Sequence, residues 1–374
     1  RDQYEAMMRR AMAALKQADP QVKCLGCIET DWVTIDPGRL DGGDRLPRAS
    51  PGHTGPTRID PALGKVIENS GLPWLDSLKR DRHGRLFLEL YMRGGKPQTA
   101  LGVYPASGNY QAKFLMDQAR FLIEQVGLDG FYIDEFSQYW ERLYDGWDGV
   151  TVDIDPRTGR ITRRYTDASL AGIQPRLELC QYAVSRGLLM VANTYATTLR
   201  ENRLPVMRFS ETWGSFDVQS IPESGKPRFV AALGRGQLGT PIGLGVLRPR
   251  GKVNSAELLR RGIVLYLRHG MTYYHYFYGD VPESGEGSGE YGPINHMFPI
   301  TPRRLFEGGI EGRERTITCV SGTYDWRHPR PPTVLAFGPD GRPKRADFDL
   351  HRKGPAWVVE LRLTDWRDVA VIEK

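Results

Sequence analysis

The sequence is poor in cysteine and has no long hydrophobic run. Only four of its 374 residues are cysteines. Cys24 and Cys27 flank Leu-Gly, but no second Cys or His pair at metal-ligand spacing accompanies them. We therefore interpret the cysteines as buried free thiols and predict no metal site. No apolar stretch reaches the roughly 20 residues of a membrane-spanning helix, so we expect no membrane span.

The chain also lacks a block of one charge sign. Its 51 basic and 45 acidic residues give a net charge of +6 and are interspersed along the chain. Nucleic-acid-binding domains concentrate Lys and Arg on one face or segment, so we expect no nucleic-acid partner. With 40% hydrophobic and 26% charged residues, the composition is typical of a soluble chain that buries one large core and a smaller one.

Motifs for cofactor binding are missing as well. The glycine-rich stretch 234–245 lacks the Lys-Ser/Thr that completes a phosphate-binding loop, and no Ser-centred nucleophile elbow occurs. Segment 153–159 partly follows calcium-loop spacing, but Pro156 interrupts it and Arg164 stands where the closing Glu is needed. We interpret this segment as a β-turn and predict neither a cofactor nor a bound metal.

What the chain does have is an alternation of helix-like and strand-like segments, which is typical of a parallel sheet covered by helices. Apolar residues at helical spacing predict helices over about 3–18, 110–126, 168–186, 196–203 and 254–268. Apolar runs predict strands at 22–29, 130–136, 188–193, 206–211, 241–247 and 271–276. The runs 85–91 and 100–104 either pair as a hairpin or supply one more strand.

This alternation predicts the α/β class and a (β/α)8 barrel over residues 1–299, with a Gly/Pro/Asp-rich insertion loop at about 36–66. If 130–136 is the fourth strand, the later runs are strands five to eight and the first strand lies upstream of Arg1. The chain starts at Arg1 in a helix-like segment, so we expect a further domain or chain before it. Over 300–374, short β-like runs separated by turns predict a small antiparallel, sandwich-like β-domain.

Polar side chains stand at the ends of the predicted strands, where a parallel barrel has its active face. Asp134 and Glu135 are the clearest, because they follow an apolar run and a buried strand has no packing use for acids. The other strand-end residues are Glu29, Asp31, Asn193, Glu211 and His275. The aromatic residues near them include Trp32, Trp140, Tyr195, Trp213 and Tyr274. Acids ringed by flat apolar surfaces suit a carbohydrate, and we predict that these residues bind one.

Glycosidic cleavage needs one carboxylic acid that protonates the leaving oxygen and one carboxylate that attacks the anomeric carbon or activates water. Asp134 and Glu211, two strands apart, are the predicted catalytic pair, and Glu135 is a further candidate acid. A carboxyl separation of about 5–5.5 Å gives retention of configuration, and about 6.5–9.5 Å gives inversion. The residues alone leave both outcomes open.

The run 128–135, Leu-Asp-Gly-Phe-Tyr-Ile-Asp-Glu, resembles the fourth-strand motif of barrel glycoside hydrolases of the α-galactosidase and α-glucosidase clan and of the α-amylase-like enzymes. The resemblance implies a barrel followed by a β-domain, with Asp134 as the nucleophile of a retaining glycosidase. It also implies that Glu211, in the run 209–213, is the general acid/base.

Two departures from these families leave the role of Glu211 open. The α-galactosidase clan usually presents an Asp at the sixth strand, where this chain has Glu211. Amylase-like enzymes place a Glu on the fifth strand, where this chain has Asn193. The anomeric configuration of the substrate is open for the same reason.

The candidate acids also have structural alternatives. Asp134 can cap a loop or pair with Arg142, and Glu211 can pair with Arg208. Glu135 alternates to the opposite side of the strand from Asp134, which favours an orientation toward the helix layer or a loop.

The predicted binding residues have structural alternatives too. Glu29 and Asp31 can organise the loop after their strand, and Asn193 can cap the following helix. His275 lies in an aromatic run that can pack at the rim of the barrel.

The sequence therefore predicts a glycoside hydrolase that acts on an oligo- or polysaccharide without a cofactor. A non-catalytic carbohydrate-binding barrel and a polysaccharide lyase are the alternatives. The expected activity favours a secreted or periplasmic location.

Overall fold

The structure is a computed structural model of residues 1–374. It describes residues 2–136, 142–143, 146–193, 198–204, 206–211, 241–245, 264, 267, 272–275, 296–297 and 299–374. The chain divides into two compact units, Arg1–Val206 and Met207–Lys374. The domain boundary expected at residue 300 stays a prediction. None of the described helices is long and apolar enough to cross a membrane.

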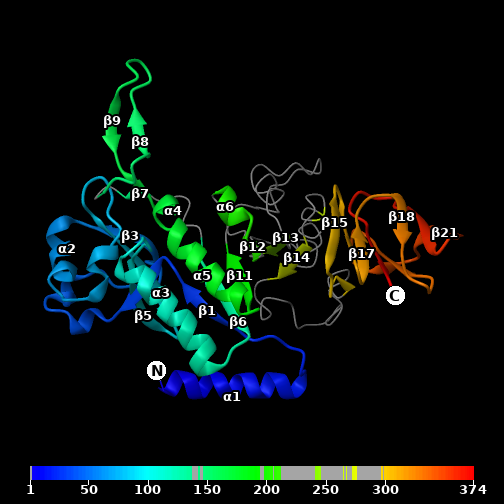
Figure 1. The fold of residues 1–374 in the computed structure, drawn as a ribbon, viewed down its shortest axis with the longest axis horizontal. Helices are drawn as coiled ribbons and strands as arrows, with labels where there is room; N and C mark the ends of the chain where they lie inside the picture. Colours follow the sequence, from blue (N-terminus) through cyan, green and yellow to red (C-terminus); the bar gives the residue numbers. More distant parts are fainter. Residues whose placement is uncertain are drawn as a thin grey trace. The chain divides into compact units, whose positions relative to one another are not determined.

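Three parallel strands form the centre of the first unit. Strand β6 (Gly130–Asp134) pairs with β1 (Leu25–Glu29) on one side and with β11 (Leu189–Asn193) on the other (Figure 1). Helix α3 (Tyr110–Arg120), with its π-helical continuation η4 (Phe121–Val126), precedes β6. Helices α4 (Ala168–Ala171) and α5 (Ile173–Ser185) precede β11, and α6 (Leu199–Asn202) follows it. The predicted α/β class is confirmed for this unit.

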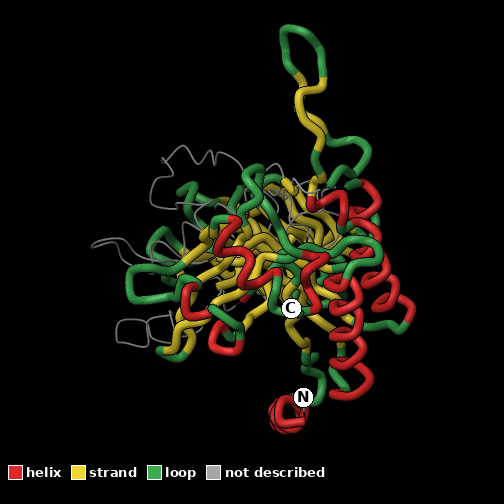
Figure 2. The backbone as a smooth tube through the Cα atoms, turned by 90° about the vertical axis from the view of Figure 1, so that its left-hand side faces the viewer, coloured by secondary structure: helices red, strands yellow, loops and turns green. Residues whose placement is uncertain are grey.

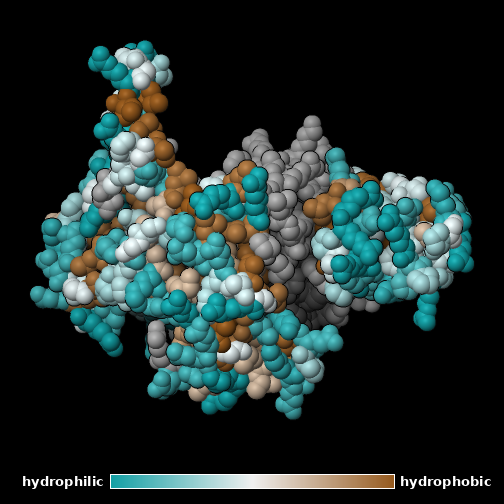
Figure 3. Space-filling view, viewed as in Figure 1, coloured by the Kyte–Doolittle hydropathy of each residue, from teal (hydrophilic) through white to brown (hydrophobic). Residues whose placement is uncertain are grey.

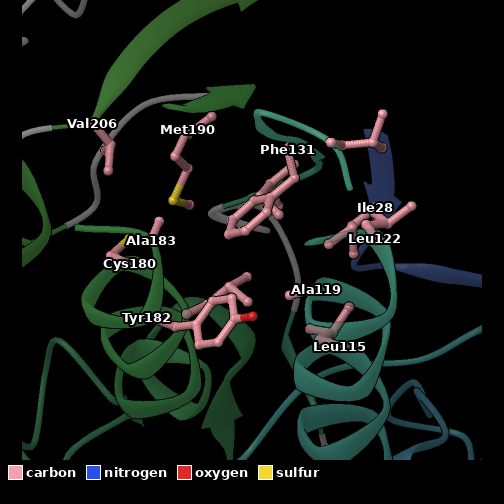
Figure 4. Close-up of a cluster of buried hydrophobic side chains, with 14 of the residues drawn as sticks. Ile28, Leu115, Ala119, Leu122, Phe131, Cys180, Tyr182, Ala183, Met190 and Val206 are labelled. Carbon is pink, nitrogen blue, oxygen red and sulfur yellow. The ribbon is translucent and has the colours of Figure 1, made fainter. Parts of the chain in front are cut away.

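One face of these strands packs against the helices. Ile28, Phe131 and Met190 point to this face and are almost fully buried against α3, η4 and α5 (Figure 4). Ile133 belongs to the same buried cluster. A Cβ atom on Gly26 would lie 2.8 Å from a methyl carbon of Leu122. The missing side chain at that position therefore allows η4 to approach β1 closely. Because side chains alternate along a strand, the residues between these core positions point to the opposite face.

A separate antiparallel sheet follows β1 in the chain. Its strands are β2 (Trp32–Ile35), β3 (Gly55–Ile59), β4 (Leu86–Arg93) and β5 (Lys96–Gly102), paired in the order β2-β5-β4-β3. The runs 85–91 and 100–104 thus pair as a hairpin, one of the two alternatives. The segment 36–66, expected as an insertion loop, contains β3 and most of helix α2 (Pro61–Glu68). Pro61 stands at the first helical position and Asp60 caps the helix, so residues that suggested a loop instead begin a helix.

Two further elements flank this unit. Helix α1 (Asp2–Ala18) rests on η4 through Met8 and Met12, which pack against the main core. Strands β8 (Val152–Ile154) and β9 (Ile161–Arg164) form a hairpin that projects from the unit in both backbone views (Figures 1 and 2). Short strands β7 (Arg142–Leu143) and β10 (Thr166–Asp167) pair at its base. The segment 153–159, interpreted as a β-turn, includes the tip of this hairpin.

The second unit begins with parallel strands and ends in a β-domain. Strand β13 (Pro241–Gly245) pairs in parallel with β12 (Met207–Glu211) and β14 (Thr272–His275). The helix predicted at 254–268 lies almost entirely outside the described residues. Closure of the parallel strands into a barrel stays a prediction.

The described tail, 299–374, is antiparallel, as predicted. One sheet has the order β15-β16-β17-β23-β19-β20 and the other β18-β22-β21. Their bounds are β15 (Pro302–Phe306), β16 (Gly309–Gly312), β17 (Arg315–Thr318), β18 (Gly322–Trp326), β19 (Thr333–Phe337), β20 (Pro343–Lys344), β21 (Asp347–Lys353), β22 (Ala356–Arg362) and β23 (Val369–Glu373). Side chains from both sheets, including Trp326, Val359 and Ile372, form one buried cluster. This sandwich-like packing gives the tail its own core.

Candidate active site

The ends of β1 and β6 bring two carboxyl groups together. In the parallel register Glu29 is the partner of Asp134, and Cys27 is the partner of Tyr132. Since positions two apart share a face, these four side chains all lie on the face opposite the helix-packed core. The structure thus unites two of the predicted site residues, Glu29 and Asp134, with two that the prediction left out.

One carboxylate oxygen of Asp134 accepts three hydrogen bonds, and the other accepts none from the described residues. Its Oδ1 accepts hydrogen bonds from the Tyr132 hydroxyl at 2.7 Å, from Asn193 Nδ2 at 2.6 Å and from the Glu135 amide at 3.1 Å. Asn193 Nδ2 also donates to the Tyr132 hydroxyl at 3.1 Å. No described residue donates to Oδ2. The three donors fix the orientation of the carboxylate through Oδ1.

Glu29 is a half-buried acid with few stabilising contacts for its charge. Its Oε1 accepts a hydrogen bond from the Asp31 amide at 2.9 Å. Burial raises the pKa of Glu29 well above its ordinary value, and the neighbouring Asp134 carboxylate raises it further. Glu29 therefore keeps its proton to a higher pH than an ordinary glutamic acid does.

Cys27 lies beside these two acids and reaches solvent. The protein packed around its thiol raises the pKa of Cys27 to about 12, with further contributions from Asp134 and Glu29. A thiol with this pKa is neutral at physiological pH, so Cys27 is a poor nucleophile.

The turn after β6 is held in an uncommon backbone conformation. Glu135 has φ +50, and no other described residue except glycine has a positive φ. The Thr30 hydroxyl lies 2.9 Å from the Asp134 carbonyl oxygen and 2.6 Å from that of Glu135, and the Phe136 amide donates to the Asn193 carbonyl at 3.0 Å. Such a conformation costs about 1–3 kcal/mol and persists where surrounding bonds enforce it. The Glu135 carboxylate contributes to the raised pKa of Glu29, so its charge lies near the Glu29–Asp134 pair.

Asp31 is the predicted binding residue that is most closed to a ligand. Its carboxylate is 1% exposed, and Oδ2 lies 2.7 Å from Nζ of Lys79, which is 0% exposed. The Lys79 ammonium also lies 5.4 Å from the centroid of the Trp32 ring. This ion pair favours the structural alternative for Asp31, in which it organises the loop after β1.

The remaining predicted residues are not joined to this site by the described side chains. Glu211 and His275 are the last residues of strands β12 and β14, as expected, and Tyr274 precedes His275. The side chains of all three lie outside the described part. Trp140, Tyr195 and Trp213 lie outside the described residues altogether, as does the side chain of Arg142, the alternative partner of Asp134. The roles of these residues stay predictions.

Besides Cys27, the sequence prediction missed Tyr132 and Lys79. Tyr132 stands two positions before Asp134, and the two-residue period of a strand was a signal that both share a face. Lys79 had no comparable signal, because its pairing with Asp31 depends on the fold. Among the described residues, no group of three or more His, Cys, Asp or Glu is placed to hold a metal ion.

No protein-family model matches the chain. No curated protein matches it either.

Some solved structures are distantly similar to the chain. A cycloalternan-degrading enzyme from Trueperella pyogenes, in complex with a covalent intermediate, shares 13% identity at a TM-score of 0.38, over 99% of this chain and 49% of that chain. A cycloisomaltooligosaccharide glucanotransferase from Paenibacillus sp., complexed with cycloisomaltoheptaose, shares 11% at 0.34, over 99% and 45%. A noncanonic maltogenic alpha-amylase from Thermotoga neapolitana shares 11% at 0.34, over 86% and 75%.

This chain thus spans about half the length of two of these three proteins. The similarity is too low to assign a family, so the function is argued from the residues of the site.

Proposed function

We propose that this protein is a carbohydrate-active enzyme that cleaves a glycosidic bond, with Asp134 as the nucleophile. The observation that carries the proposal is the environment of Asp134 at the end of β6. Three donors converge on Oδ1, whereas Oδ2 accepts no hydrogen bond from a described residue. A carboxylate that is fixed through one oxygen presents the other in a defined direction, which nucleophilic attack requires.

The proposed reaction follows the retaining route. Oδ2 of Asp134 bonds to the anomeric carbon while the bond to the leaving oxygen breaks, and a carboxylic acid protonates that oxygen. The same acid, now a carboxylate, then takes a proton from water, which attacks the anomeric carbon and frees Asp134. The hydrogen bonds from Tyr132 and Asn193 persist through both steps, because Oδ1 accepts them as a carboxylate and as an ester carbonyl.

Glu211 is the proposed general acid/base. It ends a parallel strand, as Asp134 does, and the resemblance of its sequence context motivates the assignment. Glu135 is the second choice for this role. Asn193 is proposed to orient Asp134, since its amide nitrogen already donates to Asp134 and Tyr132.

Activity measurements on single variants test the proposal. Oligo- and polysaccharides are screened for release of reducing sugar by the wild type, by Asp134→Asn and by Glu211→Gln. We expect both substitutions to lower kcat/KM, by at least about 100-fold, the lower range for loss of a general acid or base. Asp325→Asn, which changes an exposed carboxylate of the β-domain, is the matched control and keeps full activity.

Other outcomes identify the alternatives. Undiminished release of reducing sugar by Asp134→Asn contradicts the assigned nucleophile. Products with an ultraviolet absorbance from a new double bond identify a lyase. Binding of a polysaccharide by the wild type with no product at any enzyme concentration identifies a non-catalytic carbohydrate-binding protein.

A further inference from the structure

We propose that Glu29 and Asp134 form a carboxyl dyad that carries one proton, with Glu29 as the protonated member and Asp134 as the anion. The inference deepens the proposed function and rests on it for its catalytic meaning. In the dyad, Glu29 acts as a neutral hydrogen-bond donor toward a hydroxyl group of the sugar that is bound over Asp134.

The strand register supplies the first argument. Glu29 and Asp134 are direct partners in a parallel pair, both stand at the last position of their strands, and both point to the same face. Neighbouring strands are about 5 Å apart. Two carboxylates at this spacing repel strongly, and sharing one proton relieves the repulsion.

The hydrogen bonds identify the member that holds the proton. Oδ1 of Asp134 accepts from three donors, an arrangement that stabilises the ionised form. Oε1 of Glu29 accepts a single amide hydrogen bond, from Asp31, which a neutral carboxyl group also accepts. The proton therefore belongs on Oε2 of Glu29, the oxygen with no donor among the described residues.

The surrounding charges favour the same assignment. No described Lys, Arg or His forms an ion pair with Glu29 or Asp134, and the buried cation Lys79 is paired with Asp31 at 2.7 Å. Among the described residues, the titratable groups that act on Glu29 are the carboxylates of Asp134, Asp31 and Glu135, and the neutral thiol of Cys27 lies near it on its own strand. Burial and these anions act in one direction, against the ionisation of Glu29.

A titration of the carboxyl groups tests the dyad without any substrate. Protein labelled with 13C at Glu Cδ is titrated by NMR, and the Glu29 signal is assigned as the one absent from Glu29→Gln. We expect this signal to titrate above the usual range of glutamic acids. In Asp134→Asn it moves to lower pH, because the nearby anion is gone. Asp134→Ala removes the same charge and replaces Asp134→Asn in this titration if Asp134→Asn does not fold.

Glu89 provides a matched control for this titration. Burial alone raises the pKa of this half-buried residue of β4, with no acidic partner. The Glu89 signal is assigned with Glu89→Gln. If the effect on Glu29 is specific, Asp134→Asn leaves the titration of the Glu89 signal unchanged. The dyad is overturned if the Glu29 signal titrates in the usual range of glutamic acids, or if its titration is the same in Asp134→Asn as in the wild type. This holds whatever the activity measurements show.

The activity of Glu29 variants tests the role of the proton. Glu29→Gln keeps a neutral donor of the same shape, so we expect kcat/KM within about tenfold of the wild type at neutral pH. The alkaline decline of its pH profile then reflects the general acid alone. Glu29→Ala removes the donor, and we expect a loss of about 100-fold. If Glu29→Gln is as inactive as Glu29→Ala, Glu29 must ionise and the proposed role is wrong. If Asp134→Asn is fully active while the titration behaves as expected, the dyad stands and the proposed function fails.

Discussion

At the scale of single residues, two acids have opposite environments: Asp134 at the end of β6 and Asp31 just after β1. Asp134 is anchored through one oxygen by neutral donors, and its other oxygen accepts no hydrogen bond from a described residue. Asp31 is sealed in an ion pair with Lys79, and both side chains are almost fully buried. A catalytic carboxylate needs access to its ligand, whereas a buried carboxylate needs a permanent partner. The two environments therefore fit the proposed role of Asp134 in the site and a structural role for Asp31.

The Asp31–Lys79 pair allows a prediction about stability. Lys79→Met leaves the Asp31 carboxylate buried without its cation, and removal of one member of a buried pair costs about 3–5 kcal/mol. We expect a loss of that size in the free energy of unfolding, measured in urea at pH 7. The double variant Asp31→Asn, Lys79→Met leaves no uncompensated charge and should recover part of the loss. A single variant as stable as the wild type would show that the pair contributes little.

At the scale of elements, the projecting β8–β9 hairpin differs from the rest of the first unit. All residues from 156 to 164 are exposed, and its apolar residues Ile154 and Ile161 are 57% and 51% exposed. Apolar side chains are visible along it in the space-filling view (Figure 3). A two-stranded hairpin with no third strand and no helix packed on it is marginally stable and buries little apolar surface. The hairpin therefore contributes little to the stability of the fold.

Shortening the hairpin tests this. Replacing residues 155–160 with Asn-Gly, a two-residue turn that suits a tight hairpin, removes the exposed tip. We expect the free energy of unfolding to change by less than about 0.5 kcal/mol, as for surface substitutions. Chemical denaturation monitored by circular dichroism gives this value. A loss above about 2 kcal/mol would mean that the tip packs against the unit.

The elements also differ in how well the sequence predicts them. The helix at 110–126 was predictable because its apolar stripe and the terminating Gly127, which has φ +84, are local signals. Strand β3 was missed because Gly55 and Pro56 at its start are typical of loops, yet an edge strand tolerates proline. Strands β8 and β9 were missed because three or four residues are too few to establish a two-residue period.

The site was predictable only in part for a similar reason. Asp134 follows a continuous apolar run, so its place at a strand end could be deduced. Its partners Tyr132 and Asn193 depend on register, and the burial of Asp31 depends on a lysine 48 positions later. A sequence pattern does not fix such long-range pairs.

At the scale of the whole molecule, carboxyl groups with opposite pKa shifts shape the pH dependence of stability. The pKa of Asp365 is lowered to about 2, chiefly by its hydrogen bond with Arg367. Such a group contributes stability above its unfolded pKa of about 4, and the contribution is lost as the pH falls toward 2. Glu29 acts in the opposite sense because its pKa is raised. Its contribution is complete below about pH 4.3 and declines as the pH rises, since the unfolded chain releases the proton first.

Two variants separate these effects in urea unfolding at pH 3, 4.5 and 8. Glu29→Gln removes the alkaline loss, so we expect its stability relative to the wild type to rise between pH 4.5 and 8. The slope is up to about 1.4 kcal/mol per pH unit until Glu29 ionises in the folded protein. Asp365→Asn lowers stability at pH 8 by about 1 kcal/mol after solvent screening, and by less at pH 3. The sign is decisive: if Glu29→Gln loses stability relative to the wild type as the pH rises, Glu29 is stabilised as an anion in the folded protein.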